Sequence, residues 1–276
     1  MKLSVWSSYY IDLSPEAAIA ELARHGIRYC ELSDEHGEML LQRGDPKNVG
    51  AAFKAYAEQQ GVQITQGHLW LKVKLCTDSD NTVAAMYKWL DLFEAIGIRS
   101  AVLHTDTMNA TPNISVEERF CRNTAVIQRL TDYLHGRDMV ICLENLCVPG
   151  LNDTADDLLR IIHAINSPNL GICLDTGHLN ISEDKDQGAF IRKAGDYLKA
   201  LHIADNDTTC DQHLMPFGRG TVKFNEVLPA LQEIGYSGLF NFEIPGENRT
   251  TVEIRGHKLD YLVKAMTCYE AQVLGK

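Results

Sequence analysis

The chain of 276 residues lacks three features that would each point to a particular class of protein. No run approaches the roughly 18 consecutive apolar residues that a membrane-spanning helix needs. The N-terminal stretch MKLSVWSSYYIDLSPEA has no apolar core of the kind that a signal peptide carries. No GxGxxG follows the first predicted strand, so the main marker of a dinucleotide-binding fold is missing. We therefore expect a cytoplasmic protein with no membrane segment and no nucleotide cofactor.

Positive charge and closely paired cysteines are also scarce. The chain has 26 lysines and arginines against 37 aspartates and glutamates, a formal net charge of -11, which disfavours nucleic acid or an anionic membrane as the main partner. None of the eight cysteines forms a CxxC pair, and several lie in apolar segments such as VICLEN and GICLDT. Cysteine in such a segment is a small buried hydrophobe, which agrees with a reduced, cytoplasmic protein.

Strand and helix patterns alternate along the whole chain. The β-forming segment LSVWSSY precedes SPEAAIAELARHG, which has a serine N-cap, a proline at the first helical position and a terminal glycine. The predicted strands are 3–9, 28–33, 62–71, 99–104, 138–145, 169–178, 197–205 and 238–244, and the predicted helices are 14–26, 46–61, 80–97, 115–136, 154–165, 185–196, 223–235 and 250–274. Eight such units without a linker predict an α/β fold, a single (β/α)8 TIM-barrel domain over residues 1–276.

Acidic and histidine side chains recur where the predicted strands end. The ends of four successive strands carry Glu144, Asp175, His202 and Glu243. The carboxyl ends of barrel strands form the mouth at which barrel enzymes place their chemistry. In VICLE and LGICLD the residues that alternate with the carboxylate are mostly small, as expected of side chains that point into a crowded barrel. Carboxylates crowded in this way repel, so we expect one divalent ion, Mn²⁺, Mg²⁺, Co²⁺ or Zn²⁺, among them.

Further polar residues surround this predicted centre. His68 and His104 lie at or near the ends of two more strands. The stretch HIADNDTTCDQHLMPFGRG, which begins at His202, contains a D-x-H pair, Asp211 and His213, followed by a Gly-Arg-Gly. A solvated polar loop is the alternative interpretation of that stretch, and a satisfied histidine that binds nothing is the alternative for each strand-end histidine. Asp205 and Asp207 are expected either to cap the loop or to be solvated.

The motifs ICLEN, GICLDTGH, LHIADN…DQH…GRG and FNFEI, in this order, resemble the xylose isomerase-like barrel superfamily. It contains ketose 3-epimerases, hydroxypyruvate isomerase, inosose isomerases and dehydratases, and endonuclease IV-type repair enzymes. The resemblance implies that the four strand-end residues hold the metal and that two of them, Glu144 and Glu243, also move protons. It further implies a substrate-binding role for His178 and Arg219. We expect His68 and His104 to bind the substrate as well.

We therefore expect a metal-dependent sugar isomerase or epimerase. It would move a proton next to the carbonyl of a ketose or a related polyol ketone through a metal-bound enediolate, with the glutamate pair as acid and base. A dehydratase or lyase with the same intermediate is one alternative, and a sugar-binding barrel without activity is another. A small sugar or polyol is the expected partner, and homodimers or homotetramers are common in the resembling family.

A zinc-cluster phosphodiesterase of the endonuclease IV type is the remaining alternative. His178, Asp211 and His213 match an additional metal site of that branch, and His68 and His104 match ligands of another. The predicted mouth loops DEHGEMLLQRGD, TDTMNATPN and NISEDKDQ are acidic or neutral, however, whereas DNA would need basic loops. No nucleic acid partner is therefore expected.

Overall fold

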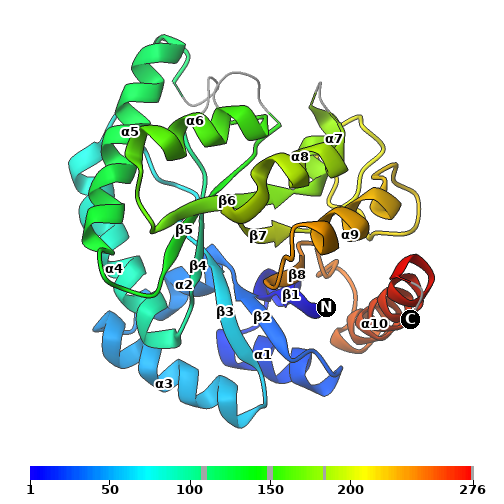
Figure 1. Ribbon diagram of the computed structural model, residues 1–276. Helices are drawn as coiled ribbons and strands as arrows, with labels where there is room; N and C mark the ends of the chain where they lie inside the picture. Colours follow the sequence, from blue (N-terminus) through cyan, green and yellow to red (C-terminus); the bar gives the residue numbers. More distant parts are fainter. Residues whose placement is uncertain (107–110, 148–151, 183–184, 275–276) are drawn as a thin grey trace.

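A computed structural model describes residues 1–106, 111–147, 152–182 and 185–274. Its eight parallel strands, ordered β7-β6-β5-β4-β3-β2-β1-β8, line a barrel (Figure 1). They are β1 (Lys2–Trp6), β2 (Tyr29–Leu32), β3 (Gln63–His68), β4 (Ser100–Leu103), β5 (Val140–Glu144), β6 (Leu170–Asp175), β7 (Leu198–His202) and β8 (Leu239–Phe242). The amide of Ile203 donates to Asn241 O at 2.7 Å, and that of Glu243 donates to Ile203 O at 3.1 Å. These two bonds close the barrel between β7 and β8.

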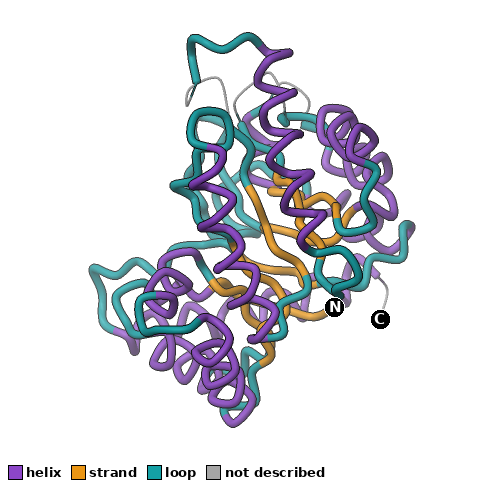
Figure 2. Tube along the Cα trace, turned by 90° about the vertical axis from the view of Figure 1, so that its left-hand side faces the viewer, coloured by secondary structure: helices purple, strands orange, loops and turns teal. Residues whose placement is uncertain are grey.

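Helices surround the strands on the outside, as the purple and orange tubes of Figure 2 show. They are α1 (Pro15–Arg24), α2 (Asp34–Leu41), α3 (Pro46–Gln59), α4 (Ser79–Ile96), α5 (Val116–Tyr133), α6 (Ala155–Ile165), α7 (Thr176–Ile181), α8 (Gln187–Ala194), α9 (Phe224–Glu233) and α10 (Val252–Leu274), with short 3₁₀ turns η1 (Ser7–Tyr10) and η2 (Gly195–Tyr197). The predicted TIM-barrel fold is confirmed. Within the described ranges, no helix is both long enough and apolar enough to cross a membrane.

Local side-chain bonds explain why the helices begin where the sequence predicts. Ser14 Oγ accepts from Ala17 N at 3.2 Å and caps α1, whose first residue is a proline. At α6 the Thr154 hydroxyl accepts from Asp157 N at 3.2 Å, and the Asp157 carboxylate accepts from Thr154 N at 3.2 Å. This reciprocal pair satisfies two amides that the helix itself cannot bond.

Several predicted boundaries differ from those of the structure. The segment DEHGEMLLQRGD, expected to be a loop, contains helix α2, which Ser33 caps by accepting from His36 N at 3.4 Å. The strand predicted for 169–178 ends at Asp175, and helix α7 follows at once. The strand predicted for 3–9 ends at Trp6, where η1 begins. Parts of the other two mouth loops, 107–110 and 183–184, lie outside the described residues.

The barrel interior is divided between small apolar side chains and polar side chains. On β4 to β7 it holds Val102, Cys142, Cys173 and Ala200, all fully buried. On β8, β1, β2 and β3 it holds Asn241, Ser4, Glu31 and Gln66, each no more than 1% exposed. The strand-end ligand candidates have the same parity as these residues, one step nearer the mouth, so they point inward above this layer.

Candidate metal centre

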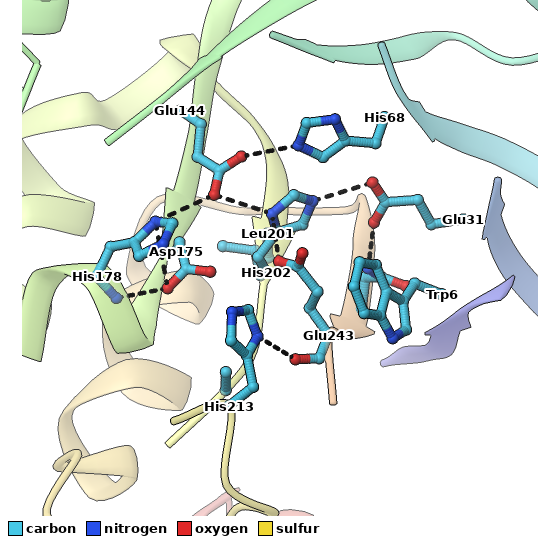
Figure 3. Close-up of polar contacts among 12 residues, drawn as sticks. Trp6, Glu31, His68, Glu144, Asp175, His178, Leu201, His202, His213 and Glu243 are labelled. Atoms are coloured by element: carbon cyan, nitrogen blue, oxygen red, sulfur yellow. Dashed lines mark hydrogen bonds and ion pairs between the residues drawn. The ribbon is translucent and has the colours of Figure 1, made fainter. Parts of the chain in front are cut away.

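The four predicted metal ligands converge at the carboxyl end of the barrel (Figure 3). Glu144, Asp175, His202 and Glu243 each offer one ligand atom, and these atoms all lie within 4.8 Å of one another. Two ligands on opposite sides of an ion, each 2.0–2.6 Å from it, are roughly 4–5 Å apart. All four residues are buried, with exposed fractions of 0–7%. The arrangement therefore has the dimensions of a site for one ion.

Three atoms of this group lack the hydrogen bonds that burial demands. Asp175 Oδ2, His202 Nδ1 and Glu243 Oε2 have no hydrogen-bond partner among the described residues. His202 Nδ1 lies 2.7 Å from Glu243 Oε2 and 3.1 Å from Glu144 Oε1, but the orientations do not make hydrogen bonds with it. An unsatisfied buried polar atom costs about 1–3 kcal/mol. One divalent ion would take a lone pair from each of the three atoms, so the residues fit a metal.

Asp175 can serve as a ligand because its two oxygens have separate surroundings. Its Oδ1 accepts from His178 N at 2.6 Å and caps α7, while its Oδ2 remains unpaired toward the group. Asn145 fixes the backbone on either side of the site, since its amide group donates to Asp175 O at 3.0 Å and accepts from Asp175 N at 2.8 Å. The cap of α7 and the two Asn145 bonds hold the ends of β5 and β6 in register, where Glu144 and Asp175 lie.

The charges of the group are strongly coupled. Burial raises the pKa of Asp175 to about 6, and the neighbouring charges of Glu144 and Glu243 add to this effect. Burial also opposes ionisation of Glu144, but His202 and His104 hold the pKa of Glu144 well below its usual range. Burial lowers the pKa of His202, yet the acidic groups Cys173, Glu144 and Glu243 raise it well above its usual value. Carboxylates at this density need compact positive charge beside them, which a divalent ion supplies.

His68 and His104 approach the Glu144 carboxylate from its other side. Glu144 Oε2 lies 3.4 Å from His68 Nε2 and 2.9 Å from His104 Nε2. Its other oxygen, Oε1, faces His202 and lies 3.3 Å from His178 Nδ1. His68 Nδ1 lies 2.7 Å from Leu69 O, an acceptor, so in the neutral ring Nδ1 carries the proton and Nε2 keeps its lone pair. The Glu144 carboxylate is thus placed between two groups of imidazoles.

The D-x-H pair also belongs to the site. Asp211 Oδ2 lies 3.2 Å from His178 Nε2 and 3.0 Å from His213 Nε2. The outer nitrogens of both rings face backbone carbonyls, His178 Nδ1 at 3.0 Å from Asn145 O and His213 Nδ1 at 2.8 Å from Glu243 O. Burial lowers the pKa of His213, but its hydrogen bond to Asp211 raises that pKa to about 10. The pair thus lies beside His178, as predicted, while residues 207–210 of the same stretch are exposed.

Hydrogen bonds within the loop between β7 and α9 fix its conformation and thereby the position of His213. Asp205 and Leu214 exchange backbone hydrogen bonds of 3.0 and 2.7 Å, and Asp205 Oδ1 accepts from Val222 N at 3.0 Å. Asp205 therefore caps the loop, which is one of the two roles expected of it. Three of its residues have the positive φ angles that L-residues rarely adopt, Thr208 (72°), His213 (46°) and Phe217 (66°). Such strain persists where the surrounding structure holds it, commonly at functional sites.

Arg219 is the last of the predicted residues, and Trp6, to which the sequence analysis assigned no role, lies beside His213. Arg219 is exposed on this loop and forms no ion pair with any described residue, so its role in substrate binding stays a prediction. Trp6 is half-buried and lies parallel to His213, with ring centroids 6.3 Å apart and 4° between the planes. Glu31, in contrast, was not predicted at all. It is fully buried on β2, and its Oε1 lies 3.0 Å from His202 Nε2. The available signal was a lone glutamate in the otherwise apolar strand YCEL.

Known proteins resemble this chain in sequence and in fold. A family model described as a xylose isomerase-like TIM barrel matches residues 19–266. The L-ribulose 3-epimerase of Methylomonas sp. (strain DH-1) is 28% identical over 251 residues, which cover 87% of this chain and 81% of that protein. A crystal structure of D-psicose 3-epimerase with D-tagatose from Clostridium cellulolyticum H10 has a TM-score of 0.80 at 20% identity and covers 99% of both chains. The 3-keto-D-glucoside 4-epimerase of E. coli has a TM-score of 0.78 at 18% identity, covering 96% of this chain and 99% of that one.

Proposed function

Because the chain belongs to the xylose isomerase-like TIM barrel family, we propose that it is a metal-dependent sugar isomerase or epimerase. It moves a proton at a carbon next to the carbonyl of a ketose or a related polyol ketone. The observation that carries this proposal is the convergence of three unpaired ligand atoms, on Asp175, His202 and Glu243, in one buried group with Glu144. The L-ribulose 3-epimerase that aligns with most of this chain supports the sugar as substrate class.

The four residues of that group would hold the ion. When bound, a divalent ion such as Mn²⁺, Mg²⁺, Co²⁺ or Zn²⁺ polarises a carbonyl and stabilises the negative charge that develops when the neighbouring carbon loses its proton. Asp175 and His202 act as ligands, and the buried surroundings of both exclude water.

Glu144 and Glu243 have the additional role of moving the proton. Their carboxylates approach His202 Nδ1 from different strands, β5 and the end of β8, at 3.1 and 2.7 Å. One carboxylate removes the proton from the carbon, and the other returns a proton to the opposite face or to the neighbouring carbon. General acid–base catalysis of this kind contributes typically 10²–10⁴-fold. His178 and His104, at the rim of the group, orient the substrate hydroxyls.

A deuterium exchange experiment tests the proposed reaction. The metal-loaded protein is incubated in deuterated water with a panel of ketoses and inososes, and the products are identified by NMR. We expect deuterium at the carbon next to the carbonyl of at least one substrate, together with its epimer or isomer. Loss of water from the same substrate would instead identify a dehydratase. Protein stripped of metal serves as the control, and absence of exchange across the panel with metal bound would refute the proposal.

A zinc-cluster phosphodiesterase is the second candidate function. The observation in its favour is that His68 and His104 on one side of Glu144, and the group His178, Asp211 and His213 on the other, supply further ligand sets around the central one. Three zinc ions per chain and nicking of abasic DNA would support it. The net charge of -11 and the acidic mouth segments favour the sugar.

A further inference from the structure

A fully buried glutamate lies directly beneath the predicted ligands and has no part in the proton transfer described above. Glu31 Oε1 lies 3.0 Å from Nε2 of His202, the nitrogen opposite the one that faces Glu144 and Glu243 (Figure 3). We propose that Glu31 is a positioning residue, which holds the His202 imidazole with its proton on Nε2 and its Nδ1 lone pair directed at the metal. The inference rests on the proposed metal centre.

The proton assignment follows from the chemistry of the two partners. An ionised carboxylate can only accept a hydrogen bond, so the ring nitrogen that faces Glu31 must donate. In the neutral ring Nδ1 then has no proton, and Nδ1 is the buried atom that lacks a hydrogen-bond partner among the described residues. If the proton were on Nδ1, it would point at the position of the ion and exclude it.

A polar layer fixes the Glu31 carboxylate in this place. Its second oxygen, Oε2, accepts from Gln66 Nε2 at 2.9 Å and from Asn241 Nδ2. Gln66 Nε2 also donates to Leu201 O at 3.2 Å, and Asn241 Oδ1 accepts from Ser4 Oγ at 2.8 Å. Four strands, β8, β1, β2 and β3, thus hold one carboxylate against the ligand on β7.

His202 faces a carboxylate outside the predicted ligand group, whereas the outer nitrogen of His178 lies 3.3 Å from Glu144 within that group. The histidines His68, His178 and His213 direct their outer nitrogens to backbone carbonyls at 2.7–3.0 Å. A buried charge has a desolvation cost that a carbonyl does not have. A carboxylate partner, however, makes the imidazole a stronger metal ligand as well as fixing its orientation, and loss of such a partner typically weakens metal binding 10–100-fold. A residue that only packed in the core would not need the buried charge of the Glu31 carboxylate.

The unaltered protein provides the first test. In an assigned ¹H–¹⁵N spectrum of the Zn²⁺-loaded, full-length protein, we expect the His202 proton on Nε2, far downfield and slow to exchange with solvent, and no proton on Nδ1. A proton on Nδ1, or zinc bound through Nε2, would overturn the proposal. If no zinc binds, the metal centre is wrong, whereas the Nε2 signal still decides whether Glu31 orients the ring.

The substitution Glu31→Gln provides the second test. Since Gln66 and Asn241 both donate to this position, the new amide keeps its oxygen toward them and turns its NH₂ toward His202. The His202 proton then moves to Nδ1. We expect Mn²⁺ binding, measured by calorimetry, to weaken about 10–100-fold and the Nε2 proton signal to disappear. Binding within twofold of the wild type, with that signal retained, would overturn the proposal.

Asp106→Asn is the matched control. The Asp106 carboxylate is also buried, but it accepts from backbone amides, those of Leu75 at 3.2 Å and Cys76 at 2.9 Å. This variant loses a buried charge and some stability without touching His202, so its Mn²⁺ affinity should equal that of the wild type. Equal losses of affinity in both variants would reduce the role of Glu31 to general stability and contradict the proposal.

Discussion

At the scale of single residues, Glu243 has two separable functions in the proposed mechanism, as a metal ligand and as a base. We expect Glu243→Gln to retain the ion, because an amide oxygen is a weaker but sufficient ligand, and to lose turnover by about 10²–10⁴-fold. Metal content and deuterium wash-in on the same samples measure both effects. Glu253→Gln, an exposed glutamate in the first turn of α10, is the control and should behave like the wild type. Turnover near that of the wild type in Glu243→Gln would mean that Glu243 is a ligand only.

Asp211 distinguishes a substrate wall from an additional metal site. It bridges His178 and His213 at 3.2 and 3.0 Å, and we expect Asp211→Asn to keep one ion per chain while kcat/KM falls as the two rings lose their anchor. Elemental analysis gives the number of ions per chain. Steady-state kinetics gives kcat/KM for the ketose that shows deuterium exchange. If the variant instead loses one ion relative to the wild type, the D-x-H pair is a metal site and the phosphodiesterase candidate gains support.

The convergence of Glu144, Asp175, His202 and Glu243 could be predicted from the sequence, whereas the place of Glu31 could not. Each central residue ends a strand or directly follows one, so a period of two and the common direction of parallel strands were enough to bring them together. Glu31 is one layer deeper, and its partners Gln66, His202 and Asn241 are 35, 171 and 210 residues away. Only the barrel register brings these partners together, and no local pattern encodes it.

At the scale of elements, the loop between β7 and α9 depends on a glycine without a side chain. A Cβ on Gly220 would lie 2.0 Å from Asp205 Oδ1, which the amides of Asn206 and Val222 hold in place. We therefore expect Gly220→Ala to lower the free energy of unfolding by about 1–3 kcal/mol and to displace His213. Urea denaturation measures the first effect.

Gly218→Ala is the matched control for that substitution. Its Cβ would meet only Met215 O, at an ordinary 3.6 Å. Unfolding free energies within about 0.5 kcal/mol of the wild type are expected for such a site. Equal destabilisation by both alanines would show that the loop is sensitive to any side chain and that the contact with Asp205 has no special role.

The helices that the sequence missed are the short ones. Helices such as α4 and α5, with 18 residues each, repeat their apolar positions often enough to be recognised. Helix α2 has eight residues and α7 has six, and they lie in segments that were assigned to a loop and to the end of a strand. The cap of α7 is Asp175, which the sequence analysis had assigned to the metal. Because Asp175 was interpreted only as a strand-end metal ligand, its second role as the N-cap of α7 was missed.

At the scale of the whole molecule, the metal should stabilise the barrel, because its ligands come from β5, β6, β7 and the residue that follows β8. An ion that binds only the folded chain adds about 2.7 kcal/mol at a concentration 100 times its Kd. We expect Mn²⁺ to raise Tm and EDTA to lower it in thermal unfolding. Asp175→Asn, which weakens one ligand, should show a smaller difference between the two conditions. An identical Tm in Mn²⁺ and EDTA for the wild type would contradict a site that joins these strands.

The most direct measurement is anomalous diffraction from crystals soaked in Mn²⁺, with data collected at the manganese edge. We expect a strong peak at the carboxyl end of the barrel, within roughly 2.0–2.6 Å of one atom each from Glu144, Asp175, His202 and Glu243, with His202 bound through Nδ1. A peak at another place, or Glu144 and Glu243 turned away from a common point, would show that these four residues do not form one metal centre.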